Sequence, residues 1–377
     1  MGARQKSDST ADYKRFVSTR FFSGLDGLRA LSVISVIWQH TSGRPGPEIS
    51  TKGYFGVDMF FAISGVLITT LLLREWDRTG RISLRGFYLR RVGRIFPLYY
   101  LVLATYVVLV LATRADTPEG QYFLAKLPAF LTYTSNWFVD LGDGTSVIFY
   151  FAWSLATEEQ FYLFWPPLLL ALLMSGRHRT AHALATLAAL IVVSQIALAG
   201  GSDTLLSTIL GSLALPILLG AALAVAANTP AGFAVLRAVS GHRWSAPALA
   251  ALVLASLTTD TPEQLTQALM ALLAISMCLR EDTWLHPVLT WRPLAWTGVV
   301  SYGIYLMHML VANAVRLVLG EQFGIALFVL TTLITLAVAS VSYRVLESRL
   351  IALARGLARR PAQRVRADAA RARPDAA

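Results

Sequence analysis

Cysteine and charged residues are both scarce in this chain of 377 residues. The single cysteine, Cys278, excludes an intramolecular disulfide and a cysteine-built metal cluster. Charged residues make up 15% of the chain, against about a quarter in an ordinary soluble domain. Hydrophobic residues reach 55%. These values argue against a soluble globular protein, and we expect neither a metal site nor a bound cofactor.

The apolar residues are gathered into long runs, and about 20 such residues cross the hydrocarbon core of a bilayer. The runs predict ten spans, near 22–41, 53–73, 92–113, 148–175, 182–200, 205–226, 245–258, 264–279, 297–318 and 324–345. Such boundaries are uncertain by about 2–4 residues. The predicted fold class is therefore all-α: a polytopic membrane protein of about ten transmembrane helices.

Basic residues outnumber acidic ones, 33 against 22, and the net charge is +11. With the N-terminus in the cytoplasm, most Lys and Arg fall in cytoplasmic loops such as 74–94, whereas loop 114–147 lies outside. This is the positive-inside pattern, and basic loops would lie against anionic lipid. We therefore expect the lipid bilayer, not nucleic acid, as a partner. The predicted location is the cytoplasmic (inner) membrane, with multiple passes and both termini cytoplasmic.

One membrane domain over residues 21–349 is predicted between two cytoplasmic tails. Residues 1–20 are polar, without an apolar segment followed by a cleavage site, so we expect the first span to be retained. Residues 350–377 are basic and predict a disordered tail. The centre of the outer loop, residues 123–139, predicts a short helix on the membrane surface. Chemistry must then come from residues within or beside the spans.

Ionisable residues inside spans cost roughly 2.5–3.5 kcal/mol each on insertion scales and commonly mark function. Arg29 and His40 lie eleven residues apart on the first span, within about 20° of one helix face. One interpretation is an anion site and a general base that face one internal cavity. The alternative is a snorkelling arginine and an interfacial histidine.

Two adjacent carboxylates lie deep in the fourth span. Five of its residues share one helix face: Ser154, Glu158, Phe161, Tyr162 and Trp165. Glu159 points about 100° away. A catalytic or binding role competes with a structural pair that is bonded to other helices. In the ninth span, Tyr305 and His308 share a face, and His308 is either a site residue or an interhelical hydrogen bond.

The second span opens with the glycine-rich stretch Gly53–Gly65. Its glycines and Ser64 allow close helix approach, and ligand contact by Ser64 is the alternative. Asp58 either orients the His40 imidazole or caps the helix start. Before the third span, Arg91 and Arg94 are i, i+3 partners with a geometry suited to clamp phosphates, although topological anchoring also explains arginines here.

Together these residues resemble the acyltransferase 3 family of multi-spanning membrane acyltransferases. Five family patterns occur in order: Arg29 and His40 with ten residues between them, the glycine-rich Gly53–Gly65, Arg91 with Arg94, Glu158 with Phe161 and Tyr162, and the late-helix stretch 301–308. The family's Glu-x-Pro near the last helix reads Glu347-Ser348-Arg349 here, so no role is carried onto Glu347.

The resemblance implies a membrane O-acyltransferase that moves an acyl group, often acetyl, from cytoplasmic acyl-CoA to a hydroxyl of a sugar, glycan or glycoside. In the family the histidine is taken as catalytic, so His40 is the expected general base. Glu158 or Asp58 would partner it, and the sequence does not choose between them. The acyl-CoA would be held by Arg29, Arg91 and Arg94. The acceptor pocket would draw on Ser64, Phe161, Tyr162, Tyr305 and His308.

Acyl-CoA, most often acetyl-CoA, is then a co-substrate, and polysaccharide O-acetylation is the expected process. A transporter or flippase for a glycan or lipid is the rival, because it would also need buried ionisable residues and a polar cavity. A further alternative keeps the acyl transfer but directs it to a small cytoplasmic molecule such as a macrolide. The sequence names neither the acceptor, the acyl chain length nor the oligomeric state.

Overall fold

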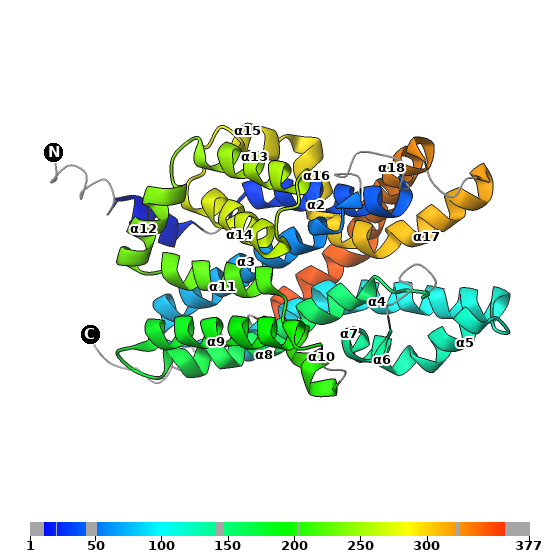
Figure 1. Ribbon diagram of the computed structural model, residues 1–377, viewed down its shortest axis with the longest axis horizontal. Coiled ribbons are helices and arrows are strands. Elements are labelled where there is room, and N and C mark those ends of the chain that lie inside the picture. Colours follow the sequence, from blue (N-terminus) through cyan, green and yellow to red (C-terminus); the bar gives the residue numbers. More distant parts are fainter. Residues whose placement is uncertain are drawn as a thin grey trace, which may run out of the picture.

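The computed structural model describes residues 11–19, 21–42, 51–140, 147–201, 204–320 and 324–358, and these residues form helices without a β-strand (Figure 1). In chain order the helices are α2 (Gly24–Thr41), α3 (Phe55–Thr79), α4 (Leu84–Thr113), α5 (Pro118–Ala125), α6 (Leu127–Leu131), α7 (Ser135–Phe138), α8 (Ala152–Leu173), α9 (Arg179–Ala199), α10 (Leu205–Gly211), α11 (Leu215–Ala227), α12 (Pro230–Ser240), α13 (Ser245–Leu257), α14 (Glu263–Leu279), α15 (His286–Leu289), α16 (Arg292–Val299), α17 (Ser301–Leu319) and α18 (Ile325–Ser342), followed by a π-helix, η2 (Tyr343–Glu347).

Each predicted span coincides with a helix, or at 205–226 with the pair α10 and α11, yet the predicted count of ten is not confirmed. Among the described residues, five helices are long and apolar enough to cross a membrane: α3, α4, α9, α17 and the continuous helix Ile325–Ala358. The pair α10 and α11, bent by 50°, would make a sixth. The helices α13 and α14 have 13 and 17 residues, fewer than the roughly 20 a bilayer needs.

Two further helices, α2 and α8, contain too many polar residues to count as membrane-spanning by composition. Asp26, Arg29 and His40 lie on α2, and the adjacent Glu158 and Glu159 lie on α8. Arg29, His40 and Glu158 are among the predicted site residues, so these two helices carry part of the candidate chemistry.

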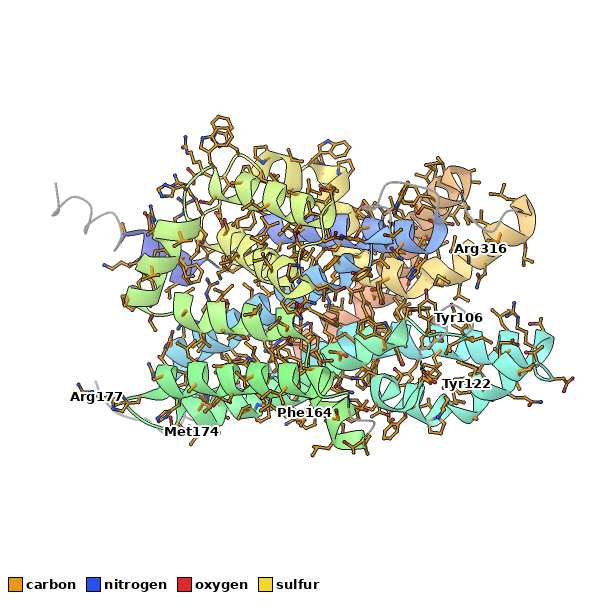
Figure 2. The ribbon with its side chains drawn as sticks, in the orientation of Figure 1. Tyr106, Tyr122, Phe164, Met174, Arg177 and Arg316 are labelled. Atoms are coloured by element: carbon orange, nitrogen blue, oxygen red, sulfur yellow. The ribbon has the colours of Figure 1, made fainter. Side chains whose placement is uncertain are left out.

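The outer surface of the bundle carries large apolar side chains, as a surface in contact with lipid requires. Phe164 and Met174 of the α8 region are 60% and 70% exposed (Figure 2). Arg177 lies at one end of the long axis in this view and Arg316 lies toward the other. Several apolar helices with apolar exposed faces indicate a multi-pass membrane protein.

Helix α3 runs through the middle of the bundle and packs against α2, α11 and α14 (Figure 1). Its contact with α11 is backbone to backbone. A Cβ atom added to Gly65 would overlap the carbonyl oxygen of Ile217, and one added to Gly220 would come within 2.5 Å of the carbonyl oxygen of Ala62. Glycine at both positions therefore lets the two helices touch, which sets the position of Ser64 beside them.

The loop after α4, for which a short surface helix was predicted, is helical and packs against the protein. Its short helices α5, α6 and α7 fold back along α4, and Phe123 and Phe130 are fully buried. Tyr133 stacks on Tyr99 with ring centroids 4.3 Å apart, and the Tyr99 hydroxyl donates to the carbonyl oxygen of Phe130 at 2.7 Å. Aromatic packing against the middle of α4 thus draws the segment into the protein.

A helical segment over residues 11–18 precedes α2 and is fastened to two later helices. The guanidinium of Arg74, in α3, donates to the carbonyl oxygens of Phe16 and Thr19. The hydroxyl of Tyr13 donates to the carbonyl oxygen of Asn228, at the end of α11, at 2.8 Å. The segment therefore closes one end of the bundle.

Candidate active site

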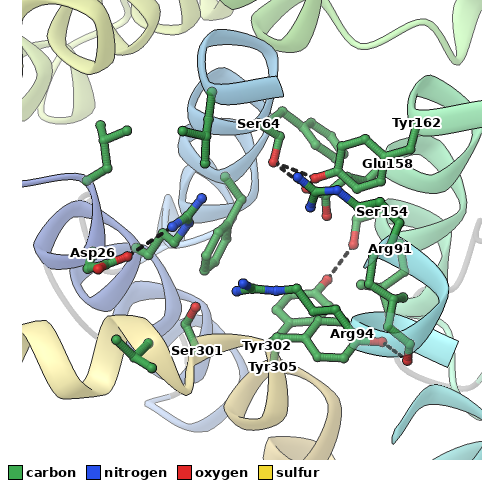
Figure 3. A pocket seen from close by; sticks show the side chains of 18 of the residues that line it. Asp26, Ser64, Arg91, Arg94, Ser154, Glu158, Tyr162, Ser301, Tyr302 and Tyr305 are labelled. Atoms are coloured by element: carbon green, nitrogen blue, oxygen red, sulfur yellow. Dashed lines mark hydrogen bonds and ion pairs between the residues drawn. The ribbon is translucent and has the colours of Figure 1, made fainter. Parts of the chain in front are cut away.

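A cavity of about 440 Å³ lies between α2, α3, α4, α8 and α17 (Figure 3). Four arginines line it: Arg29, Arg91, Arg94 and Arg355. Hydroxyl groups and the carboxylates of Asp26 and Glu158 line the remainder, together with aromatic and aliphatic side chains such as Phe60 and Leu71. Arg355 is exposed, so the cavity opens at the end where the arginines gather.

The arginines differ in the contacts that their guanidinium groups make within the protein. Arg29 donates to Asp26 at 3.0 Å, one turn earlier on α2. Arg91 lies over the ring of Tyr162, with its guanidinium carbon 4.6 Å from the ring centroid. Arg94 makes no hydrogen bond or ion pair with any residue of the described ranges, although it lines the cavity (Figure 3). A half-buried guanidinium of this kind is suited to bind a phosphate or carboxylate from a ligand.

The carboxylate of Glu158 forms a polar part of the cavity wall. It accepts hydrogen bonds from the hydroxyls of Ser64 and Tyr162, and the Tyr162 hydroxyl also lies 3.0 Å from the Ser64 oxygen. Ser154, one turn earlier on α8, bonds the hydroxyl of Tyr305 at 2.6 Å. The predicted face of α8 therefore contacts α3 and α17 through hydroxyl groups.

The two predicted histidines meet outside this cavity. His40 Nδ1 lies 2.9 Å from His308 Nε2, and the rings are stacked with centroids 5.0 Å apart and an interplanar angle of 21°. His308 is fully buried, with Nδ1 2.5 Å from the carbonyl oxygen of Tyr305. His40 is half-buried in the last turn of α2, and its own carbonyl oxygen accepts from Arg316 at 2.6 Å. The candidate histidines of the first and ninth predicted spans thus form one pair.

The single cavity expected for Arg29 and His40 is not observed. Arg29 lines the cavity and His40 does not, because Tyr305 stands between them. The Tyr305 ring lies 6.3 Å from the Phe60 ring on the cavity side and 5.6 Å from the His308 ring on the other. The structure therefore divides the candidate residues into an arginine-lined cavity and a histidine pair.

The cavity contains seven of the predicted site residues: Arg29, Arg91, Arg94, Ser64, Glu158, Tyr162 and Tyr305. Phe161 lies outside it and stacks on Trp165 at 5.9 Å. Four predicted residues thus fall elsewhere, since Asp58 also lies outside together with His40 and His308.

Neither carboxylate that was considered as a partner of His40 contacts it. Glu158 is bonded within the cavity, and Asp58 accepts from the side-chain amide of Gln267, on α14, at 3.3 Å. Asp58 also does not cap α3, whose N-cap is Tyr54 without a side-chain hydrogen bond. The histidine partner is His308 instead, a contact that joins residues 268 positions apart.

One residue near the end of the chain belongs to the site although the sequence did not single it out. Arg355 lines the cavity, because residues 350–358 continue the helix that begins at Ile325. The predicted disordered tail is therefore wrong for residues 350–358, and residues 359–377 lie outside the described ranges. Glu347 is 6% exposed and accepts from Ser342 at 3.2 Å. The helix-forming stretch Ile351–Leu357 was the available signal for this extension.

No three side chains of His, Cys, Asp or Glu gather as a metal site within the ranges that the structure describes. The site itself supplies arginines, hydroxyls, carboxylates and imidazoles. These groups can bind an anionic ligand at the cavity mouth and accept a proton at the histidine pair.

Comparison with known proteins identifies relatives over almost the whole chain. A family model described as an acyltransferase domain matches residues 22–344. A Bacillus subtilis protein provisionally named peptidoglycan O-acetyltransferase YrhL is 29% identical over 368 residues, which cover 89% of this chain and 56% of that protein. The peptidoglycan O-acetyltransferase OatA of Listeria monocytogenes is 28% identical over 359 residues, which cover 88% of this chain and 56% of OatA.

The chain thus spans little more than half the length of the curated relatives it matches. No solved structure matches it.

Proposed function

Since the chain belongs to the acyltransferase 3 family, whose model matches residues 22–344, we propose that it is a membrane O-acyltransferase with acyl-CoA as donor and a glycan hydroxyl as acceptor. The acyl group is acetyl and the glycan is of the peptidoglycan class, as the names of the two relatives suggest for those proteins. Acyl-CoA acts as a co-substrate, without a bound cofactor.

The observation that carries the proposal is the arginine-lined cavity. Arg91 and Arg94 lie one turn apart on α4 and both line it, together with Arg29 from α2. Coenzyme A carries phosphates at one end and its thiol at the other, so a donor held by its phosphates at the mouth would direct its thioester inward. Charge-assisted contacts from arginine to phosphate are among the strongest hydrogen bonds in proteins.

His40 is the general base in this proposal. A neutral imidazole has an ordinary pKa of about 6.5, which suits proton abstraction from a hydroxyl near neutral pH. Tyr305 separates His40 from the cavity, so the thioester must pass this side chain or the acyl group must move in two steps. Glu158 is bonded to Ser64 and Tyr162, and its role is to shape the donor side of the cavity.

The membrane arrangement that goes with this mechanism has ten spans and cytoplasmic termini in the inner membrane. Five helices and the bent pair α10 and α11 are long and apolar enough to cross a membrane. In this arrangement α2, α8, α13 and α14 supply the other four spans. Basic residues such as Arg85 and Arg90 then lie at the cytoplasmic end of α4, beside the cavity mouth. This arrangement would place the arginines where cytoplasmic acyl-CoA arrives.

Incubation of the purified protein with radiolabelled acetyl-CoA and soluble peptidoglycan fragments tests the proposal. The expected result is an alkali-labile label on the glycan and stoichiometric release of free coenzyme A. Label on a macrolide but not on glycans would move the acceptor to a small molecule. If no acceptor is labelled, and glycan movement across proteoliposomes proceeds without the donor, the protein is a transporter and the proposal is wrong.

A further inference from the structure

We propose that His308 is a positioning residue that holds the His40 imidazole in the tautomer with its proton on Nδ1 and its lone pair on Nε2. The tautomer follows from hydrogen bonds alone. Its use by the acceptor hydroxyl rests on the proposed function. Each ring nitrogen of a neutral histidine is either a donor or an acceptor, and its partner decides which.

A chain of hydrogen bonds runs from the main-chain carbonyl of Tyr305 through His308 to His40. The carbonyl oxygen of Tyr305 can only accept, so His308 Nδ1, at 2.5 Å, must carry the proton. This contact lies within one turn of α17, where the backbone is fixed by the helix. His308 Nδ1 is therefore a donor in every arrangement of the pair.

His308 must also be neutral, because a protonated ring would donate from both nitrogens and could not accept from His40. It is fully buried, and no carboxylate in the described ranges bonds to either ring of the pair. The charged group that faces them is Arg316 of α17, while Tyr150, Phe151 and Tyr305 supply neutral rings. A buried cation without a counter-charge and beside another cation is strongly disfavoured.

A neutral His308 with its proton on Nδ1 has a lone pair on Nε2. His40 Nδ1, 2.9 Å away, must then donate, so its own Nε2 is left unprotonated. Free neutral histidine carries its proton mainly on Nε2, so the pair reverses the ordinary preference. A positioned partner that sets the tautomer of a reacting imidazole is a recurrent device in enzymes.

Packing leaves the two imidazole rings little freedom to rotate out of this hydrogen-bonded arrangement. His308 is packed between the rings of Phe151, at 5.4 Å, and Tyr305, at 5.6 Å. His40 is stacked on His308, and its carbonyl oxygen is fixed by Arg316. Both histidines lie on long helices, so the hydrogen bond joins two rigid elements.

In the transfer step, the acceptor hydroxyl gives its proton to His40 Nε2 while its oxygen bonds to the acyl carbon. The bond from that carbon to sulfur breaks, and the departing thiolate takes the proton back from the imidazolium. His308 exchanges no proton in this scheme, because its Nε2 only accepts from His40 Nδ1. It acts by keeping the reacting lone pair on the side away from itself.

Two matched substitutions separate positioning from packing. In His308→Gln, the side-chain oxygen can take the place of Nε2 and accept from His40, whereas His308→Leu fills a similar volume without an acceptor. We expect the Leu variant to lose transfer by on the order of 10²-fold or more, and the Gln variant to keep at least about ten times the Leu rate. Acetyl-CoA affinity should be unchanged in both, because His308 does not line the donor cavity. Equal rates in the two folded variants would overturn the positioning role.

Histidine-selective ¹⁵N NMR of the full-length protein supplies a readout that needs no activity. The chain has six histidines, and the His40 signals are assigned by their loss in His40→Ala. We expect protonated Nδ1 and unprotonated Nε2 at His40 in the wild type, and a shift toward protonated Nε2 in His308→Leu. A wild-type His40 with its proton on Nε2 overturns the inference even if transfer occurs. If His40 has the expected tautomer but the protein transfers no acyl group, the inference about His308 stands and only the proposed function is refuted.

Discussion

Arg29 and His40 lie on one helix, about 16 Å apart along its axis, yet only Arg29 lines the cavity. The rigid helix fixes the distance between the anion-binding end and the imidazole. The side chain of Tyr305, from α17, lies between Arg29 and His40, so the two residues do not line the same cavity. In the proposed mechanism, donor binding and proton abstraction are therefore separable by mutation.

The donor-binding role of α4 is tested by Arg91→Ala and Arg94→Ala, singly and together. Each lost charge-assisted contact to phosphate should cost about 1.5–3 kcal/mol of binding free energy. Lysine at either position should restore only part of the affinity, because it lacks the planar fork. Calorimetric titration with acetyl-CoA measures this.

Arg85→Ala is the matched control for these arginines, since Arg85 is exposed on the same helix and does not line the cavity. Its affinity for acetyl-CoA should equal that of the wild type. Unchanged affinity in the Arg91 and Arg94 double variant would leave these two residues as topological anchors.

The catalytic role of His40 is tested by His40→Ala. The variant should insert and bind acetyl-CoA normally, because His40 is outside the cavity. Its transfer rate should fall by about 10²–10⁴-fold, the usual contribution of a general base. The measurement is transfer of radiolabel to the glycan, with donor affinity determined on the same preparation. Near-normal transfer by the folded variant would place the chemistry elsewhere.

The contact between α3 and α11 predicts that Gly65→Ala is destabilising. The added methyl group meets the backbone of Ile217, which cannot move as a side chain can, and overpacking of this kind typically costs about 1–3 kcal/mol. Thermal unfolding in detergent should show a lower midpoint. Gly356→Ala is the control, because nothing lies within 4 Å of its added Cβ atom. Equal midpoints for the two variants would contradict the close contact.

The loop between α14 and α15 should loosen in acid. Hydrogen bonds from Arg280, and then from Arg243, lower the pKa of Asp282 to about 2. A lowered pKa means that the contribution to stability is complete above the ordinary value near 3.9, and is lost as the pH falls from there to about 2. Because Asp282 is half exposed, solvent screens the effect and it should be local.

Trp284 reports this change, since its ring stacks on Trp244 at 5.5 Å and its amide donates to the carbonyl oxygen of Arg243. Hydrogen exchange at the Trp284 amide should accelerate over that acidic range. In Asp282→Asn the exchange should be faster at neutral pH and should show no acid step. An unchanged acid step in this variant would assign it to another group.

The proposed ten-span arrangement predicts that the C-terminus is cytoplasmic. A reporter fused after Ala377 that is active only in the cytoplasm should give a signal, and one that is active only outside should not. The opposite pattern would require an odd number of spans or an inverted orientation. A second reporter in the 177–179 loop, also predicted cytoplasmic, distinguishes these two cases.

Much of the helical framework could be predicted from the sequence, because long apolar runs indicate where helices form. Arg29 and Glu158 were found for a related reason: a charge within an apolar helix has few alternatives to a polar interior. The number of spans was harder, since helices such as α13 are short and α8 is rich in polar residues.

Contacts between distant residues were beyond sequence reasoning. The spacing of His40 gave its helix face but no information that His308 would meet it, so a carboxylate partner was preferred on chemical grounds. Nothing in the composition of the loop helices α5–α7 reveals that Tyr133 stacks against Tyr99. Both contacts concern tertiary packing, which local patterns do not encode.

The fastening of the segment over residues 11–18 has a consequence for biosynthesis. Tyr13 bonds to a carbonyl oxygen 215 residues further along the chain, so this contact cannot form until most of the bundle has left the ribosome. Arg74 becomes available much earlier and can hold Phe16 and Thr19 in the meantime. The segment can therefore contact α3 before it contacts α11, so the closure of that end of the bundle takes place in two steps.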